Sequence, residues 1–347
     1  MHRPRSVRDA DVAGKRVLVR SDLNVPLEDG RVADETRIEA SLPTLRLLLE
    51  RGAAGIRVCS HLGRPKGPDP AFTIEPVRER LRELVPDERI EVLENTRFNP
   101  GETKNDPEFA RELAAGCDLF VEDAFGSVHR AHASTVGVVE LLPAYAGLLL
   151  ERELEELGKL LGDVERPFVL VSGGAKVEDK LGGKADTVLI GGKMAEELRD
   201  ENPLDFEVVL PTDVVAAATF DAEAESTVCP FDALPEAWLG LDIGPQTREA
   251  FEAELSRAKT IFWNGPMGVF EWPRFAAGTK AVAEAVAGAD AFSVVGGADS
   301  IRALNELGLT DSVSWASTGG GAALELLEGK QLPGVAVIPQ EVDARQR

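Results

Sequence analysis

Short runs of apolar, often β-branched residues recur along the chain, and stretches of helical periodicity separate them. In the first half the pattern predicts strands over residues 16–23, 56–60, 90–93 and 119–121. In the second half it predicts strands over 168–171, 187–190, 208–210, 261–263, 292–295 and 314–316. Apolar residues return every three or four positions in 34–51, 76–84, 107–115 and 279–287, which indicates helices. Such alternation predicts parallel sheets with helices on both faces.

These runs are too many for one compact sheet, so we expect an α/β protein with two doubly wound, parallel-sheet (Rossmann-like) domains. Residues 145–161 carry leucines at helical spacing among Glu and Lys, and Pro167 follows them. We therefore predict domains 1–165 and 166–347, joined by this helix as a hinge. The last residues could pack back on the first domain. Pro43 should kink or divide the helix at 34–51.

The amino-acid composition argues against several classes of protein function. The chain has 38 Lys and Arg against 60 Asp and Glu, a net charge of −22, which disfavours binding to nucleic-acid phosphates. No apolar run is long enough to span a membrane and no signal segment is evident, so we expect a cytoplasmic protein, and a monomer. Cys59, Cys117 and Cys229 lie far apart, which argues against a disulfide framework. The acidic excess fits either an ordinary acidic protein or a salt-adapted one.

Basic and polar residues follow the predicted strands of the first half. Asp22 and Asn24 follow the first strand, His61 and Arg64 follow the second, and residues 95–97, 122–126 and 129–132 follow the others. Ligands bind at the carboxyl ends of parallel strands, and arginine grips carboxylate and phosphate with two nitrogens. A single arginine of this kind would ordinarily belong to an ion pair on the surface. Several of them at matching strand ends predict a small ligand with more than one negative charge. His129 and His132 have no third metal ligand at a suitable spacing.

Glycine occupies the corresponding places in the second half, at 172–176, 191–193, 264–268, 296–299 and 318–321. Glycine lets backbone N–H groups approach phosphate oxygens, so five such loops predict a nucleotide site. Neither a P-loop nor a GxGxxG motif is present. Lys176 and Lys180, four residues apart, suit stabilisation of a moving phosphoryl group, and Asp299 suits Mg²⁺ shared with phosphates. An anion site and a nucleotide site on separate domains predict a phosphotransferase.

Several long motifs closely resemble the phosphoglycerate kinase family, and the resemblance covers nearly the whole chain. They are residues 19–26, 60–65, 123–126 with 129–135, 173–177, 263–271 and 317–321. The resemblance implies reversible phosphoryl transfer between ATP and 3-phosphoglycerate, in glycolysis and gluconeogenesis. It places the acid on the N-terminal domain and the magnesium nucleotide on the C-terminal domain.

The resemblance also implies site residues. For the acid substrate they are Asp22, Asn24, Arg37, His61, Arg64, Arg130 and Arg166. For the nucleotide they are Gly173, Lys176, Lys180, Gly191, Asn264, Glu271, Gly296, Gly297, Asp299 and Ser300. Within these sets Glu271 would take the ribose and Asp299 the Mg²⁺. Arg37 and Lys176 would grip the transferring phosphoryl group, with Gly320 beside it. No general base is needed, because a carboxylic acid is already ionised at neutral pH.

The chain departs from the family pattern near the expected nucleotide site. Residues 181–185 and 194–209 are shorter than usual, and Lys193 and Ala298 stand where the family has glycine. Ser300 replaces threonine and keeps the hydroxyl. A pocket with fewer apolar walls should discriminate weakly between nucleotide bases. Two alternatives stay open: a non-catalytic, ligand-sensing relative, and a kinase for another carboxylic acid, which the arginine set opposes.

Overall fold

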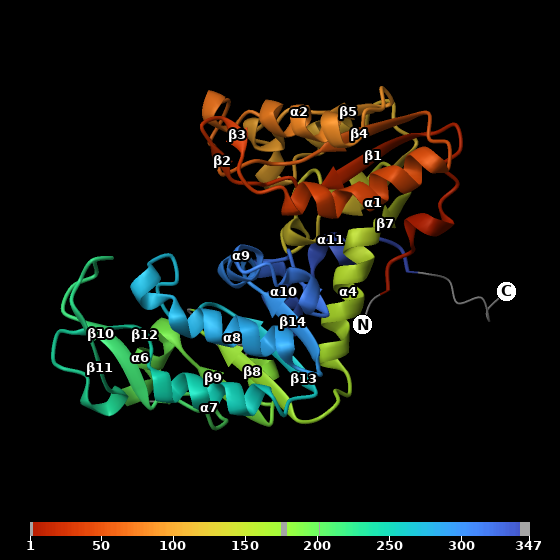
Figure 1. Ribbon diagram of the computed structural model, residues 1–347. Coiled ribbons are helices and arrows are strands. Elements are labelled where there is room, and N and C mark those ends of the chain that lie inside the picture. Colours follow the sequence, from red (N-terminus) through yellow and green to blue (C-terminus); the bar gives the residue numbers. More distant parts are fainter. Residues whose placement is uncertain (1–2, 175–178, 201, 341–347) are drawn as a thin grey trace. The chain divides into compact units, whose positions relative to one another are not determined.

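The computed structural model describes residues 3–174, 179–200 and 202–340, and it divides into two compact units (Figure 1). The first unit comprises residues up to 155 together with the segment from 330 onward, and the second unit comprises residues 156–329. The division falls inside helix α4 (Leu148–Leu161), ten residues before the predicted boundary.

The first unit is built on a five-stranded parallel sheet. Its strand order is β5 (Ile90–Val92), β4 (Gly55–Cys59), β1 (Arg16–Ser21), β6 (Leu119–Asp123) and β7 (Ala144–Ala146). Helices α1 (Thr36–Glu50) and α2 (Glu75–Leu84) pack on the face that carries Val17 and Val19. Helix α3 (Pro107–Ala114) precedes β6, and a small hairpin joins β2 (Leu27–Glu28) and β3 (Arg31–Val32). Burial on both faces explains the continuous apolar runs in the sequence.

The end of the described chain belongs to this first unit. Short helix α11 (Pro333–Ala336) lies against the loop after β6, where the Gly334 N–H donates to the Val128 carbonyl at 2.8 Å. A Cβ on Gly334 would lie 3.0 Å from the Val128 backbone, so glycine permits this approach. The Arg5 N–H donates to the Pro339 carbonyl, which ties the two ends of the described chain together.

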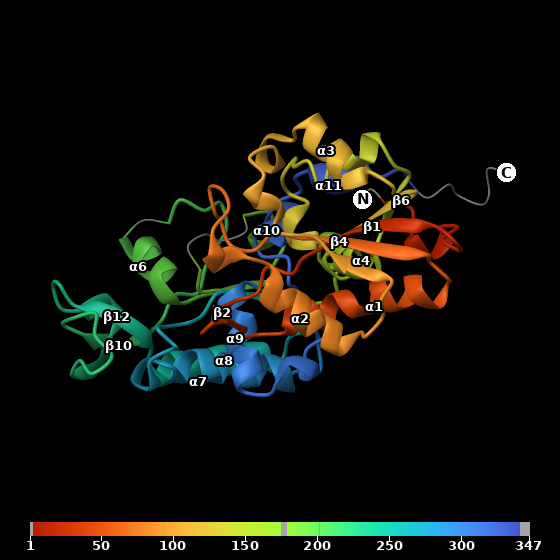
Figure 2. The same ribbon diagram turned by 90° about the horizontal axis from the view of Figure 1, so that it is seen from above.

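The second unit repeats the same design. Its parallel sheet has the order β15 (Trp315–Ala316), β14 (Phe292–Gly296), β13 (Thr260–Asn264), β8 (Phe168–Ser172) and β9 (Thr187–Ile190). Its helices are α5 (Asp179–Gly182), α6 (Gly192–Asp200), α7 (Pro245–Leu255), α8 (Ala277–Gly288), α9 (Ala298–Glu306) and α10 (Gly321–Leu327). Helices α7 and α8 lie side by side in both ribbon views (Figures 1 and 2). The doubly wound α/β fold is therefore confirmed in each unit.

A second, antiparallel sheet in this unit was not predicted. It has the order β11 (Ser226–Pro230), β10 (Asp213–Ala217) and β12 (Leu239–Ile243), and it contacts α7 and α8 near one end (Figure 2). Strand β11 is mostly exposed, so it lacks the apolar run on which the prediction relied. The strand predicted at 208–210 is absent, because Val209 makes only one isolated bridge to Leu189.

In the first unit the predicted start of one helix was wrong, and the predicted division of another helix at Pro43 does not occur. Residues 144–146 form strand β7, and the helix predicted from residue 145 begins only at Leu148. Pro43 neither divides nor ends α1, which runs unbroken from Thr36 to Glu50. Pro43 is exposed, and water can therefore take the place of the hydrogen bond that its missing N–H would have made.

Strand order reverses once in each parallel sheet, and the reversal defines a crevice at the carboxyl ends of the strands. In the first unit β1 leads outward to β4 and β5, whereas β6 returns to the other side of β1. In the second unit β8 leads to β9, and β13 returns to the other side of β8. The loops after β1 and β6, and those after β8 and β13, therefore flank the places where ligands are expected.

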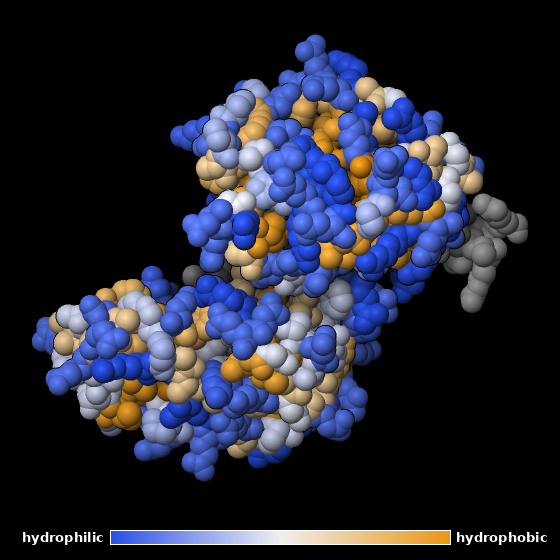
Figure 3. Space-filling view, turned by 45° about the horizontal axis from the view of Figure 1, so that its top comes forward, coloured by the Kyte–Doolittle hydropathy of each residue, from blue (hydrophilic) through white to orange (hydrophobic). Residues whose placement is uncertain are grey.

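The face seen in Figure 3 is mostly hydrophilic, with apolar residues scattered among charged ones. Within the described ranges, no helix combines the length and the apolar character needed to cross a membrane.

Replacing Gly147 with alanine tests the packing between β7 and α4. The Gly147 N–H donates to the Glu122 carbonyl, and a Cβ here would lie 2.2 Å from Oδ1 of the buried Asp123. That oxygen also accepts from the Leu149 N–H, so it has little room to move. We expect Gly147→Ala to lower the free energy of unfolding by about 1–3 kcal/mol in urea titrations.

The control is Gly288→Ala at the end of α8, where a Cβ would meet nothing within 4 Å. Its free energy of unfolding should stay within about 0.5 kcal/mol of the wild type. Equal stability of the two variants would contradict the packing argument.

Candidate active site

Loops at the carboxyl edge of the first sheet bring most of the predicted acid-binding residues together. Asp22 and Asn24 follow β1, and Arg37 in the first turn of α1 forms an ion pair with Asp22. The Asn24 side-chain oxygen accepts from the Gly63 N–H at 2.7 Å, which ties the loop after β1 to the loop after β4. The second of these loops carries His61 and Arg64.

Arg97, which was not among the predicted substrate residues, lies in the same cluster. It follows β5 in a short 3₁₀ turn, and its guanidinium donates to the Gly63 carbonyl at 2.5 Å. Burial lowers the pKa of Arg97, and repulsion from Arg130 and Arg20 lowers it further. Mutual repulsion of this kind marks a site that an anion would stabilise.

His61 is buried beside these cations. Burial lowers its pKa well below the usual value, and the charges of Arg20 and Arg97 act in the same direction. The ring is therefore neutral at pH 7, so it can serve as a hydrogen-bond donor without adding to the positive charge.

Arg166 is the predicted acid-binding residue that comes from the other unit. It belongs to the second unit, where its guanidinium lies 2.5 Å from Asp186 Oδ1 and also donates to the Lys184 carbonyl. A hydrogen bond from the Phe168 N–H lowers the pKa of Asp186, and so does Arg166. The structure therefore gives Arg166 a role in holding the start of β8 to the loop before β9.

In the second unit the glycine loops pack directly against each other. The Gly173 N–H donates to the Asn264 carbonyl at 3.0 Å, and the Gly191 N–H donates to the Ser172 carbonyl at 2.9 Å. A Cβ on Gly173 would lie 1.8 Å from the Pro266 carbonyl oxygen. A Cβ on Gly297, whose φ is +83°, would lie 2.5 Å from Asn264 Oδ1. Part of the glycine pattern therefore reflects loop packing, which also brings Gly173, Gly191, Asn264 and Gly297 together.

Ser300 and Gly296 support the same loops. The buried Ser300 hydroxyl accepts from the Gly265 N–H at 2.7 Å, which explains why a hydroxyl is needed at this position. Gly296 ends β14, and a Cβ there would approach the Phe262 ring at 3.4 Å. Gly320 has a φ of +50° and precedes α10, so it can hold a backbone conformation that other residues rarely adopt.

Glu271 and Asp299 share one arginine that sequence reasoning missed. An Arg302 guanidinium nitrogen lies 2.5 Å from Glu271 Oε1 and 3.6 Å from Asp299 Oδ1. The guanidinium also lies over the Phe270 ring, 4.6 Å from its centre. Arg302 and Asp299 are three residues apart on α9, a spacing that could have indicated the pairing.

The residues around Asp299 fit a magnesium ion that arrives with phosphates. Among the residues that the structure describes, no group of three or more His, Cys, Asp or Glu side chains could hold a metal by itself. The Asp299 side chain is 59% exposed and offers one carboxylate, of which Oδ1 faces Arg302. Mg²⁺ is commonly held by one or two carboxylates with phosphate oxygens and water as its other ligands.

The two lysines predicted for the nucleotide site, Lys176 and Lys180, follow β8 in the sequence. Lys176 lies outside the described residues. Lys180 lies in the backbone of α5, but its side chain is outside the described set.

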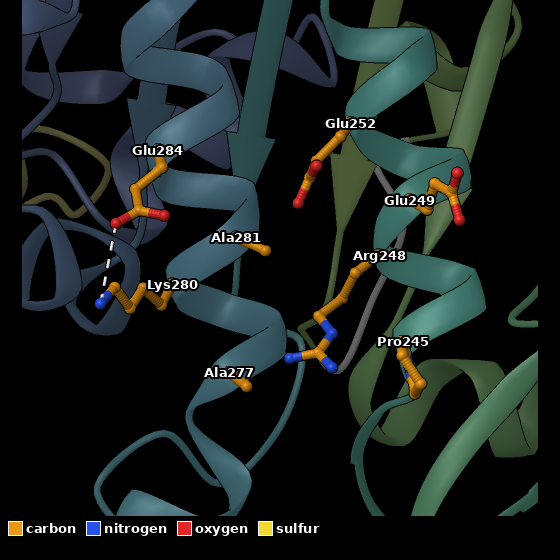
Figure 4. A pocket seen from close by; sticks show the side chains of 8 residues that line it. All are labelled: Pro245, Arg248, Glu249, Glu252, Ala277, Lys280, Ala281 and Glu284. Carbon is orange, nitrogen blue, oxygen red and sulfur yellow. Dashed lines mark ion pairs between the residues drawn. The ribbon is translucent and has the colours of Figure 1, made fainter.

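A groove of about 350 Å³ between α7 and α8 is a different feature (Figure 4). Arg248, Glu249 and Glu252 line it from α7, and Lys280 pairs with Glu284 on α8. The lining mixes both signs of charge and includes none of the predicted site residues. We therefore do not place the active site in this groove.

An arginine cluster on one α/β unit and clustered glycine loops on another define the class of the protein as a phosphotransferase. Comparison with known proteins agrees. The phosphoglycerate kinase family model matches residues 7–202 and 196–330. The phosphoglycerate kinase of Rubrobacter xylanophilus is 50% identical over 97% of this chain and 98% of its own length. A phosphoglycerate kinase of Thermus thermophilus is 49% identical over 96% of this chain and 99% of its own length.

Solved structures give the same result. Phosphoglycerate kinase from Coxiella burnetii superposes with a TM-score of 0.82 at 35% identity, covering 96% of this chain and 98% of that one. The Pyrococcus horikoshii enzyme also gives 0.82, at 31% identity and the same coverage. The chain belongs to the phosphoglycerate kinase family.

This chain is shorter than its relatives. The alignment with the Rubrobacter protein spans 387 positions, whereas the chain has 347 residues. In the segment predicted to be contracted, between β9 and Val209, the structure describes the single helix α6.

Replacing Arg97 and Arg166 separately tests which arginine belongs to the anion site. Inorganic phosphate should raise the melting temperature of the wild type by relieving the repulsion between Arg97 and Arg130. In Arg97→Met, phosphate affinity measured by calorimetry should fall by roughly tenfold or more. Arg166→Met should keep the wild-type affinity, because its guanidinium is paired with Asp186. A loss of affinity in Arg166→Met alone would reverse this assignment.

Proposed function

We propose that the chain transfers a phosphoryl group reversibly between ATP and the carboxylate of 3-phosphoglycerate, giving ADP and 1,3-bisphosphoglycerate. Its place would be in glycolysis and gluconeogenesis. The single observation that carries the choice of substrate is the repulsion between Arg97 and Arg130 at the carboxyl edge of the first sheet, to which the buried Arg20 adds. A small ligand with two anionic groups would neutralise Arg97 and Arg130.

The acid would be held by Asp22, Asn24, Arg37, His61, Arg64, Arg97 and Arg130. Asp22 already aligns the Arg37 guanidinium through their ion pair, so this cation is preorganised before the ligand arrives. The carboxylate of the acid is ionised at neutral pH and can attack phosphorus without a general base.

The nucleotide would bind at the glycine loops of the second unit. Gly173, Gly191, Gly296 and Gly297 would admit the phosphates, Glu271 would take the ribose, and Asn264 and Ser300 would hold the loops in shape. Lys176, Lys180 and Gly320 complete the proposed set. Asp299 would hold Mg²⁺, which when bound supplies neutralisation of phosphate charge.

Catalysis would then consist of positioning and charge stabilisation. Arg37 from the first unit and Lys176 from the second would contact the transferring phosphoryl group from opposite sides. Because these residues belong to different units, the reaction requires the units to bring their ligands together, with α4 as the proposed hinge. Closure would also exclude water, a competing acceptor. We further propose that the enzyme works in the cytoplasm as a monomer.

A coupled assay with 3-phosphoglycerate and MgATP tests the function directly. The wild type should turn over, and Arg37→Ala should lower kcat by about 10²–10³, because it removes one preorganised donor. Calorimetric affinity for MgADP should be unchanged, since Arg37 lies on the other unit.

The matched control is Arg46→Ala, an exposed arginine on the same helix α1, which should keep wild-type kcat. If the wild type binds both ligands without turnover, the chain is a ligand-sensing relative. If Arg37→Ala loses MgADP affinity as sharply as kcat, the division of labour between units is wrong.

Asp299→Asn tests the proposed magnesium ligand. Removal of the carboxylate charge should weaken MgADP binding by about tenfold while leaving metal-free ADP binding unchanged. Titration calorimetry with and without Mg²⁺ measures both. Glu306→Gln is the control, because Glu306 also lies near Arg302, at 3.9 Å, and it should alter neither affinity. Equal losses with and without Mg²⁺ would assign Asp299 to nucleotide contact instead of metal binding.

A further inference from the structure

Arg20 is an arginine with no exposed surface, and it lies in the middle of the first sheet. It is the fifth residue of β1 and pairs in register with Cys59 on β4 and Glu122 on β6. Its Nε donates to Ser134 Oγ at 2.9 Å, and one terminal nitrogen donates to the Ser21 carbonyl. The other terminal nitrogen lies 2.9 Å from His61 Nδ1. Because it is fully buried, Arg20 acts on any ligand only through its neighbours.

The donor and acceptor of each hydrogen bond around Arg20 can be assigned, starting from the carboxylate of Glu102. Burial opposes ionisation of Glu102, but a hydrogen bond from His132 and the charge of Arg20 lower its pKa to about 2. An ionised carboxylate only accepts, so the Ser134 hydroxyl must donate to Glu102 Oε1, at 2.6 Å. The Ser134 oxygen then accepts from Arg20 Nε.

The same logic fixes the protons of His61. A guanidinium has only N–H donors, so His61 Nδ1 must accept from Arg20. A neutral imidazole that accepts at Nδ1 carries its one proton on Nε2. The charged groups that act on His61 are Arg20, Arg97 and Arg37, against Glu102 alone. Three cations against one anion disfavour a second proton on the ring.

We propose that Arg20 is a positioning residue that fixes His61 as the neutral Nε2–H tautomer. His61 then presents one N–H donor of fixed identity to an anionic ligand, and it does so without a charge of its own. The involvement of a ligand rests on the function proposed above, whereas the tautomer is a property of the free protein.

Nitrogen NMR of the ligand-free protein with ¹⁵N-labelled histidine tests the tautomer. His61→Gln assigns the His61 signals among the four histidines. Between pH 6 and 8 the wild type should show an unprotonated Nδ1 and a protonated Nε2, with no titration. A protonated Nδ1, or a His61 ring that titrates in this range, would overturn the proposal without any variant being made.

Two substitutions test the role of Arg20 itself. Arg20→Met removes the donor, and His61 should then populate both tautomers and titrate nearer its ordinary pKa. Arg20→Lys keeps a donor and should preserve the Nε2–H signal, even where Arg20→Met fails to fold. The control is Arg51→Met, since the half-buried Arg51 donates to the carbonyls of Val7, Arg8 and Ala10, and His61 should be unaffected. An unchanged tautomer in folded Arg20→Met would overturn the assignment.

Titration with 3-phosphoglycerate separates this inference from the proposed function. Above about pH 7, where the phosphate group of the ligand has largely lost its second proton, the wild-type affinity should vary little with pH. Arg20→Met should bind about tenfold more weakly at pH 8. If the tautomer changes in Arg20→Met but the affinity does not, His61 is no ligand donor and that part of the proposed function is wrong. If the affinity falls while the tautomer is unchanged, the acid site stands and the positioning role of Arg20 is wrong.

Discussion

Parallel pairing of strands is the constraint on which both units depend. When all strands of a sheet point the same way, their carboxyl ends meet at one edge, and every connection must return along a face. The reversal of strand order between β1 and β6, and again between β8 and β13, opens a place for ligands at that edge. The residues that follow these strands are therefore the ones that the fold makes available for chemistry.

The two edges carry different chemistry because they use different parts of the residue. In the first unit long side chains would contact the ligand. Like-charged guanidinium groups such as those of Arg97 and Arg130 repel each other, and a bound anion would relieve this repulsion. In the second unit the backbone of the glycine loops forms the edge. The absence of side chains at Gly173 and Gly297 lets neighbouring loops touch at this edge. Arg302 joins Glu271 to Asp299 on this second edge.

A buried cation underlies the first of these edges. Burying a guanidinium costs free energy unless its donors are satisfied, and Arg20 meets this need with hydroxyl, carbonyl and imidazole acceptors. Ionised Glu102 lies nearby and offsets part of the charge. The same arrangement includes a hydrogen bond to His61 Nδ1. The contacts that satisfy the buried Arg20 therefore also determine which nitrogen of His61 can donate to a ligand.

The sequence by itself predicted the strands of both parallel sheets except β7, and the strand-end motifs from which the acid-binding set is proposed. Burial on both faces leaves continuous apolar runs, and the chemistry follows directly after them. It did not predict β11, which is exposed and lacks such a run, or the unbroken α1 around Pro43. Only the tertiary structure distinguished Arg97, which lies among other cations, from Arg166, which is paired with Asp186. Both are arginines next to strands, and periodicity reports only which face is buried. The interaction between charges depends on their distance in space, and that distance is decided by strand order and loop packing.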